Sequence, residues 1–363
     1  MILLLVFLLA LIVGTYIVMQ QPRFGKAPAG NRLKRIQKSA NYHNGRFNNL
    51  SKTPQFSDEA NFGEILKGWY TTKRRRPKGV IPSVKNNLKS IPANANVLVW
   101  FGHSSYFMQI DGRKFLVDPV FCGHASPFSF SIKAFPGTDI YTVNDMPKID
   151  YLVITHDHWD HLDYETVKAL QPKIQKVITG LGVGEHLEYW GYEKEKIVEQ
   201  DWHESVEPEN GLSFFTMPAR HFSGRRFKPK QTLWASFALI TPSKKIFIGG
   251  DGGYDTHFAE IGKKIGGFDL AILENGQYNK AWKYIHLMPE QVLKAASDLK
   301  AKRLLPVHSG KFALAQHAWD EPLRKISLLN KDAGINLITP KIGELVYLND
   351  NTQKFSQWWE EVE

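Results

Sequence analysis

The segment Tyr151–Asp163 (YLVITHDHWDHLD) places three histidines and three aspartates within eight positions, directly after an apolar run. His156, His158, Asp160 and His161 form the pattern H-x-H-x-D-H. Imidazole and carboxylate groups are the ligands that a catalytic zinc ion prefers, and a catalytic site keeps one position open for water. Two histidines two residues apart can turn toward one ion, while the Asp–His pair that follows can reach a second. The pattern therefore predicts a metal site at the end of a strand.

Three more zinc-compatible side chains follow apolar runs later in the chain, namely His221, Asp251 and His308. Taken alone, each is more typical of an ordinary polar or turn residue. In this order after H-x-H-x-D-H, they extend the metal-site hypothesis. Since functional sites are usually built where strands of a rigid sheet pass into loops, we expect these side chains to meet.

The H-x-H-x-D-H pattern after a strand resembles the signature of the metallo-β-lactamase superfamily. Further blocks are similar to those of one branch, the N-acyl-phosphatidylethanolamine-hydrolysing phospholipases D and their bacterial relatives. These blocks are WFGHSSYFMQIDGRKFLVDPVF, ITHDHWDHLD, MPARHFSGR, IGGDGGY, WKYIHLMPEQ and PVHSGKF, within a similarity that spans about residues 45 to 325. The resemblance implies an α/β fold, a four-layer αββα sandwich with a dinuclear metal site at one edge.

The resemblance also implies which side chains bind metal and what the metal does. Two zinc ions share seven ligands, although iron or manganese would fit similar ligands. His156, His158 and His221 hold one ion, Asp160, His161 and His308 hold the other, and Asp251 bridges both. A hydroxide between the two ions would attack phosphorus in a phosphodiester.

Two residues are candidate catalytic groups. Asp160 would orient the hydroxide while serving as a ligand, and His286 matches a histidine that lies near the metals in the phospholipase branch. His286 would contact the substrate phosphate or the leaving group, or would instead be a capping or core histidine. His103 and Asp118 are interpreted as partners that fix the orientation of the ligands. Asp157 stands where the branch usually has Asn, and it is expected to add negative charge near the site.

The elements that must position these residues are short apolar runs typical of strands. The Asp111-Gly112 step separates two such runs as a hairpin turn would. Helical spacing appears at YETVKALQ and at PEQVLKAASDLKA, the latter beginning with Pro289. Strands are expected at NVLVWFG, SYFMQI, RKFLVDPVF, DYLVITH, KVITG, LSFFTMPARH, WASFALIT, KKIFIGGD, DLAILEN and RLLPVHSG. Strands with interleaved helices predict sheets covered by helices.

The N-terminus predicts a membrane anchor. Eighteen uncharged residues, Ile2–Met19, follow Met1, and a helix of this length can just cross a hydrocarbon layer of about 30 Å. A cleaved signal peptide is the alternative, although a basic first region and a small-residue cleavage site are not clearly present. The expected organisation is an anchor at 1–20, a basic juxtamembrane linker and arm at 21–90, a catalytic domain at 91–350 and a C-terminal tail at 351–363.

Basic residues gather next to the expected anchor. Residues 21–90 contain 16 Lys or Arg against three acidic residues, a net charge of +13 that exceeds the +10 of the whole chain. Because positive flanks stay on the cytoplasmic side, we expect a single-pass protein with its catalytic domain in the cytoplasm. The segment would also attract anionic lipids, by about 1 kcal/mol per cation, or it is simply a solvated linker. No nucleic-acid-binding module is recognisable, so a nucleic-acid partner is not expected.

The predicted function is that of a dinuclear zinc hydrolase at a membrane. The favoured substrate is an N-acyl-phosphatidylethanolamine-like lipid, cleaved into a phosphatidic acid and an N-acyl-ethanolamine-type alcohol. Hydrolysis of another small ester, such as a lactone or a soluble phosphodiester, stays open because a fold does not choose its substrate. A non-catalytic, membrane-tethered metal-binding protein is the third alternative. The single cysteine, Cys122, excludes an intramolecular disulfide, and the sequence says nothing about oligomeric state.

Overall fold

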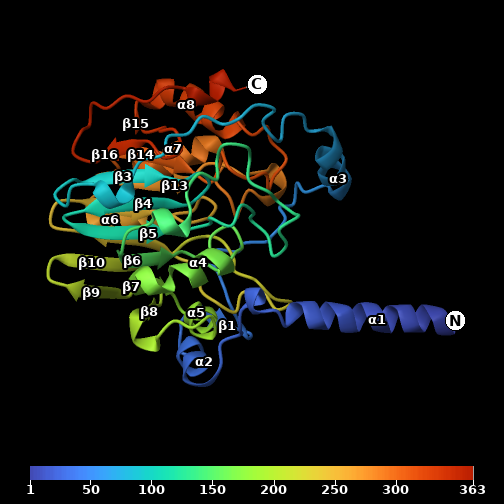
Figure 1. Ribbon diagram of the computed structural model, residues 1–363. Coiled ribbons are helices and arrows are strands. Elements are labelled where there is room, and N and C mark those ends of the chain that lie inside the picture. The colour runs from blue at the N-terminus through green and yellow to red at the C-terminus, as the bar shows by residue number, and fades with distance from the viewer. Residues whose placement is uncertain (363) are drawn as a thin grey trace.

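The computed structural model describes residues 1–362 and contains two seven-stranded sheets that face each other (Figure 1). The first sheet is antiparallel from β16 to β5 and parallel from β5 to β8. In spatial order its strands are β16 (Leu345–Tyr347), β3 (Val97–Trp100), β4 (Tyr106–Ile110), β5 (Arg113–Val117), β6 (Ile149–Ile154), β7 (Ile174–Gly180) and β8 (Ile197–Gln200).

The second sheet repeats this plan, with antiparallel pairing from β9 to β12 and parallel pairing from β12 to β15. In spatial order its strands are β9 (Ser205–Glu209), β10 (Leu212–Met217), β11 (Ser236–Ile240), β12 (Lys245–Ile248), β13 (Leu270–Glu274), β14 (Arg303–Val307) and β15 (Asn336–Leu337). A separate two-stranded ribbon pairs β1 (Tyr42–His43) with β2 (Arg46–Phe47).

The strands have apolar side chains on both faces because both faces are covered. In β3, Leu98 and Trp100 point into the core between the sheets, while Val99 points to the outer core of the first sheet. In β12, Ile246 and Ile248 face the central core, and Phe247 faces the outer core of the second sheet. The near-continuous apolar runs in the sequence follow from this double burial.

Helices cover the outer face of each sheet, which completes the four αββα layers. On the first sheet lie α4 (Tyr164–Leu170), which contributes Val167 and Leu170, and α5 (Gly184–Tyr189). On the second sheet lie α6 (His257–Ile265), α7 (Pro289–Asp298) and α8 (Glu321–Ala333). The expected fold class, a metallo-β-lactamase-type sandwich, is confirmed. Short 3-10 helices occur at Pro22–Phe24, Leu88–Ser90, Val143–Asp145, Gln171–Lys173, Lys194–Lys196, Lys280–Trp282 and Trp358–Glu361.

The N-terminal helix α1 (Ile2–Met19) projects away from the domain (Figure 1). It has 18 residues with a mean hydropathy of 2.9 and no buried side chain within the described chain, so it is a candidate membrane span. After it, α2 (Gly30–Ile36) packs against the domain and buries Ile36 in the central core. The helix α3 (Phe62–Thr71) lies at the domain edge on the side from which α1 projects (Figure 1).

The segment 21–90 is more tightly packed than its polar composition suggests. Arg32 on α2 contacts three carboxylates: its Nε lies 2.7 Å from Glu199, and its Nη1 lies 2.9 Å from Glu185. Its Nη2 contacts Glu188 at 2.5 Å. Phe47 of β2 is fully buried in the central core. These contacts come from residues more than 150 positions away, so the sequence alone did not indicate them.

The C-terminal segment also joins the core. Trp358 is fully buried, packs near Trp100 and Trp319, and donates a hydrogen bond from Nε1 to the Pro340 carbonyl at 3.1 Å. Trp359 beside it is 1% exposed. Two large aromatic side chains therefore fill the space at the end of the sandwich.

Candidate metal centre

The candidate site lies where strands of both sheets end. H-x-H-x-D-H follows β6 of the first sheet directly, and the buried strand ends at Ile154 because the polar motif begins there. His221 follows β10, Asp251 follows β12, and His308 follows β14 of the second sheet. His103 comes from the turn between β3 and β4. The site therefore lies across the seam between the two sheets.

Three imidazoles form the first group of neighbouring side chains. His156 Nε2 lies 2.9 Å from His158 Nδ1, and His221 Nε2 lies 3.2 Å from the same nitrogen. His156 and His221 are each 1% exposed. Three nitrogen atoms directed at one small volume suit a single cation. Hydrogen bonds among the three rings cannot satisfy all of these nitrogens at once, because each neutral imidazole has only one donor and one acceptor nitrogen.

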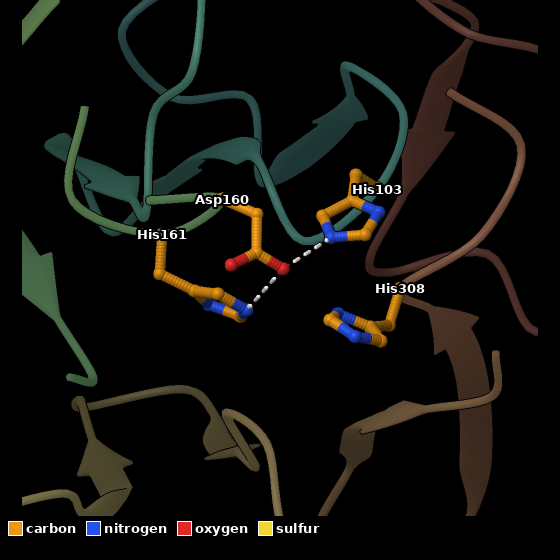
Figure 2. A group of neighbouring side chains, drawn as sticks. All are labelled: His103, Asp160, His161 and His308. Carbon is orange, nitrogen blue, oxygen red and sulfur yellow. Dashed lines mark hydrogen bonds and ion pairs between the residues drawn. The ribbon is translucent and has the colours of Figure 1, made fainter. Parts of the chain in front are cut away.

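The second group joins Asp160, His161 and His308, and the structure adds His103 to it (Figure 2). Asp160 Oδ2 lies 2.8 Å from His103 Nε2 and 3.6 Å from His161 Nε2. The rings of His103 and His308 lie with centroids 4.2 Å apart. The four ligand atoms lie within 4.8 Å of one another, so this group also has the dimensions of a cation site.

Asp251 lies between the two groups and faces both of them. Its Oδ1 is 3.2 Å from His161 Nε2 and 3.1 Å from His308 Nδ1. Its Oδ2 is 4.0 Å from His156 Nε2 and 3.8 Å from His221 Nε2. One carboxylate thus presents one oxygen to each group, which is the arrangement of a ligand shared by two ions. The structure brings together all seven side chains that the sequence singled out.

Unpartnered polar atoms show that this cluster is suited to metal. His161 Nε2 and Asp251 Oδ1 are buried and have no hydrogen-bond partner within residues 1–362, although they lie 3.2 Å apart. A buried polar atom without a partner costs about 1–3 kcal/mol, so such atoms call for an explanation. A divalent cation that accepts lone pairs from both would remove this cost. The donor set of imidazole and carboxylate without thiolate fits zinc and also iron or manganese.

Burial and charge set the protonation states. Burial lowers the pKa of His156, His221 and His308 well below the usual histidine value, so these rings are neutral at pH 7 and present lone pairs. Burial would raise the pKa of Asp251, but the neighbouring histidines lower it well below the usual value, so the group is ionised. Neutral imidazoles and an ionised carboxylate are the protonation states in which these side chains bind metal.

A layer of hydrogen bonds fixes the ligand rings. Asp118 Oδ2 lies 2.8 Å from His161 Nδ1 and accepts a hydrogen bond from the Thr155 hydroxyl at 2.6 Å. This agrees with the orienting role expected of Asp118. His221 Nδ1 lies 2.8 Å from the Ile285 carbonyl and donates to it, which directs Nε2 into the site.

The backbone at the site is strained. His103, Asp118 and His308 have φ angles of 52°, 41° and 66°, in the left-handed region that few residues other than glycine adopt. Each such residue costs on the order of 1–3 kcal/mol. The packed sheets around them hold these angles, which aim the three side chains at the site.

Sequence reasoning missed Glu274, which controls His286. Glu274 ends the buried strand β13, and its Oε2 lies 2.6 Å from His286 Nδ1. Its Oε1 accepts a hydrogen bond from the Gly252 amide at 2.7 Å. Burial raises the pKa of Glu274 to about 7. Burial alone would lower the pKa of His286, but Glu274 raises it to about 9, so His286 carries a proton at neutral pH.

The position of Glu274 was a signal that the sequence already contained. An acidic residue directly after the apolar run LAIL is the same pattern that singled out Asp251 and His308. The pairing with His286 is not visible in the sequence, because the two belong to different elements. His286 therefore lies beside the metal-ligand candidates, with its ring 5.1 Å from that of His221.

Asp157 points away from the ligand groups. Its carboxylate accepts hydrogen bonds from the Gly224 amide at 2.7 Å and the Thr232 hydroxyl at 2.9 Å, and it contacts His186 Nε2 at 3.2 Å. Burial would raise its pKa, but the hydrogen bond with His186 and neighbouring charges lower it to about 2. The carboxylate therefore stays ionised, and with Asp160 it opposes the lowering of the His158 pKa by burial.

A pocket of about 490 Å³ lies over the ligands and has mostly apolar walls. His286 and several of the candidate ligands form its floor, and aromatic and aliphatic side chains form its sides. The walls include Phe56, Ile65, Trp69, Ile132, Trp159, Phe222, Trp282, Ile285 and Leu314. An apolar pocket with a few polar groups at its base is the usual form of a small-molecule or lipid site.

Residues 113–309 match the family described as the beta-lactamase superfamily domain, which is more than half of the chain. An uncharacterized protein of Mycobacterium tuberculosis is 36% identical over 333 residues, covering 89% of this chain and 88% of that protein. The N-acyl-phosphatidylethanolamine-hydrolyzing phospholipase D 1 of Caenorhabditis elegans is 31% identical over 228 residues, covering 59% of this chain and 64% of its own length.

Among solved structures, a metallo hydrolase of the hyperthermophilic archaeon Ignicoccus hospitalis has a similar fold. Its TM-score is 0.54 at 21% sequence identity, and the match covers 70% of this chain and 98% of that one. At this identity the similarity concerns the fold alone.

Proposed function

Since the chain belongs to the beta-lactamase superfamily and is a metal-dependent hydrolase, we propose that it is a dinuclear zinc phosphodiesterase of the phospholipase D type. Its substrates are N-acyl-phosphatidylethanolamine-like lipids. The products are a phosphatidic acid and an N-acyl-ethanolamine-type alcohol. The relative from Caenorhabditis elegans carries this activity in its name, and the apolar pocket over the ligands supports a lipid substrate.

The observation that carries the proposal is the placement of Asp251. With Oδ1 facing His161 and His308, and Oδ2 facing His156 and His221, it would hold two ions at a short separation. His156, His158 and His221 would hold one ion, and Asp160, His161 and His308 would hold the other. Two divalent ions bound there supply an acidified water and offset the negative charge that develops on the phosphate.

Asp160 orients the attacking water in this proposal. Its Oδ2 is held by His103 Nε2 at 2.8 Å, which leaves Oδ1 to accept a hydrogen bond from the water. The water oxygen forms a bond to phosphorus while the bond from phosphorus to the ethanolamine oxygen breaks. In-line displacement of this kind depends mainly on positioning and on charge stabilisation.

His286 serves the leaving group. Glu274 holds Nδ1 of His286, which leaves Nε2 for a ligand in the pocket that His286 lines. Because the pKa of His286 is raised to about 9, the ring has a proton to donate to the departing ethanolamine oxygen at neutral pH. The neutral alcohol is then released, and the phosphate stays on the diacylglycerol product.

The membrane anchor completes the proposal. We infer that α1 spans the bilayer with the basic segment and the catalytic domain on the cytoplasmic side. An insoluble substrate then reaches the enzyme by lateral diffusion. The basic residues of segment 21–90 favour anionic leaflets in the same way.

The test uses the full chain purified in detergent. Its metal content is measured by elemental analysis, and hydrolysis is assayed with N-acyl-phosphatidylethanolamine, an aryl phosphodiester, a cyclic nucleotide and a lactone. We expect two zinc ions per chain and turnover of the lipid, both lost in Asp251→Ala. The exposed histidine His43 provides the control His43→Ala, which should retain both. Turnover confined to the lactone or to soluble diesters would refute the lipid assignment, and metal without any turnover would refute the enzymatic one.

A further inference from the structure

The helix α3 has one broad apolar stripe, and the two edges of this stripe have different surroundings. Ile65 and Trp69, one turn apart, form part of the pocket wall. Phe62, Leu66 and Tyr70 have the same spacing but face outward, and they are 68%, 61% and 84% exposed. A helix on the surface of a soluble domain normally has one apolar stripe and one polar face. Phe62 lies with its ring 5.2 Å from that of Phe56, but Leu66 and Tyr70 remain largely exposed within residues 1–362. The outward edge of the stripe is therefore only partly covered by the domain.

Contacts to the domain do not account for the stability of this helix. None of its ten residues is buried in the described chain, and isolated helices of this length are marginal in water. The helix is held by Gln316, which donates to the Ile65 carbonyl, and by the Arg75 guanidinium, which lies 4.0 Å above the Trp69 ring. Both contacts act on the inner face, so the outer face is free to meet another surface.

The rim of the pocket connects α3 with the base of α1. Trp159 and Pro127 also line the pocket. The Trp159 ring packs against Phe24 at 5.2 Å, and Arg23 donates a hydrogen bond to the Pro127 carbonyl. Arg23 and Phe24 lie just after the last turn of α1. The pocket lining is thus connected to the segment that follows α1 through Trp159 and Pro127, and it includes Ile65 and Trp69 of α3.

Both helices lie on one side of the domain. Figure 1 shows α1 projecting from the side at whose edge α3 lies. Phe130 is 77% exposed and stacks on Phe128, whose ring lies 6.4 Å from that of Phe24, just after α1. Basic residues follow α3 closely: Lys73, Arg74, Arg75, Arg76 and Lys78. Exposed apolar and aromatic side chains next to cations are the composition of a surface that lies in the headgroup region of an anionic leaflet.

We propose that α3 lies in the bilayer leaflet from which α1 emerges, with Phe62, Leu66 and Tyr70 inserted at the boundary between headgroups and acyl chains. This inference rests on the proposed membrane-anchored function and adds to it. The inner face of α3 then forms a wall that leads from the leaflet to the ligands, so a lipid enters the pocket sideways without crossing water. The occupant of the outer face is the bilayer itself.

The experiment measures where α3 lies, independently of activity. A nitroxide label is attached at Tyr70→Cys in a Cys122→Ser background, in the full chain reconstituted into vesicles of phosphatidylcholine and phosphatidylglycerol. Collision with oxygen, which concentrates in lipid, is compared with collision with a water-soluble nickel complex. The matched control is Leu328→Cys on α8, which is 62% exposed. We expect lipid-like accessibility at position 70 and water-like accessibility at position 328. Equal, water-like values at both positions would overturn the inference.

A second variant tests the consequence for substrate delivery. The double substitution Leu66→Ser and Tyr70→Ser changes no residue that lines the pocket. We expect the KM for vesicle lipid to rise by about 10-fold or more, with unchanged turnover of a soluble aryl phosphodiester. Leu328→Ser is the control. An unchanged KM for vesicle lipid would overturn the inference even if the lipid is a substrate. A lipid-like label at position 70 supports the inference even if the wild type hydrolyses only soluble esters.

Discussion

The ion cluster around Arg32 allows a sharp comparison between two arginines on the same short helix. Arg32 places its three guanidinium nitrogens on the carboxylates of Glu185, Glu188 and Glu199, and its side chain is 12% exposed. Arg35, one turn further, contacts only Glu204, and both side chains of that pair are about half exposed, at 49% and 48%. Arg32→Ala and Arg35→Ala remove the same chemical group, so burial and the number of partners are what differ.

The expected magnitudes follow from these surroundings. Removing one partner from a buried ion cluster costs about 3–5 kcal/mol, because the remaining charges stay buried without compensation. Since Glu188 is 32% exposed and Lys26 stays 3.3 Å from Glu185, we place the loss for Arg32→Ala at the lower end, about 3 kcal/mol. An exposed pair is worth about 0–1 kcal/mol, and this is the loss expected for Arg35→Ala.

Urea unfolding followed by tryptophan fluorescence measures both values. Ile36 at the end of α2 is fully buried in the central core, so loss of the arm is coupled to unfolding of the domain. With a slope of about 3 kcal/mol per molar urea, Arg32→Ala lowers the midpoint by about 1 M. Arg35→Ala shifts it by a third of that or less. Equal shifts in the two variants would refute the reasoning, because they would show that burial of the cluster contributes nothing.

Four further predictions concern the site and the core. Glu274→Gln leaves His286 without its carboxylate partner, so the pKa of His286 falls from about 9. The alkaline limb of the pH profile of kcat then moves to lower pH, and kcat falls by about 10²–10³. An unchanged alkaline limb would exclude His286 as the acid. Asp157 has a pKa of about 2 in the folded protein, compared with the ordinary value of 3.8. Its ionised form therefore stabilises the folded state fully at pH values above 3.8, and this stabilisation is lost as the pH falls through about 2. Asp157→Asn should therefore unfold about 2 kcal/mol more easily than wild type near pH 6, with a difference that shrinks toward pH 2 in acid titrations of stability. Removal of metal by a chelator should abolish activity and lower the midpoint of thermal unfolding, and added zinc should restore both. An unfolding midpoint that does not change with chelator would contradict metal binding between the two sheets. Trp358→Ala opens a large cavity in the central core and should cost about 3–5 kcal/mol in urea unfolding, whereas a cost below 1 kcal/mol would show that this end of the sandwich is loosely packed.

Much of the fold and the site was visible in the sequence because local pattern carries it. Strands β6, β12 and β14 are short, largely apolar runs, and His156, Asp251 and His308 follow them, so the sequence indicated strand ends and candidate ligands together. The strand β9 was not expected, since its sequence SVEPE is polar and contains a proline, as tolerated at a sheet edge. An edge strand such as β9 forms because its backbone pairs with the neighbouring strand, and a single sequence does not show which strands pair.

Contacts between distant segments account for what the sequence could not show. His103 is interpreted as a residue that orients ligands, and its hydrogen bond to Asp160 fits this role, but a partner 57 positions away is not visible in the sequence. Glu274 was overlooked because its partner His286 belongs to another element. Asp157 is expected to add charge near the site, and its ionised carboxylate acts on His158, but its hydrogen-bond partners Gly224, Thr232 and His186 are not visible in the sequence.

The burial of Trp358 and Trp359 sets an order of events during synthesis. The hydrophobic helix α1 leaves the ribosome first, while this tryptophan pair leaves more than 300 residues later, which takes tens of seconds. The central core cannot close before then. If α1 is captured by the membrane on emergence, the domain completes its folding while already tethered, next to lipid and with its inner apolar faces still open.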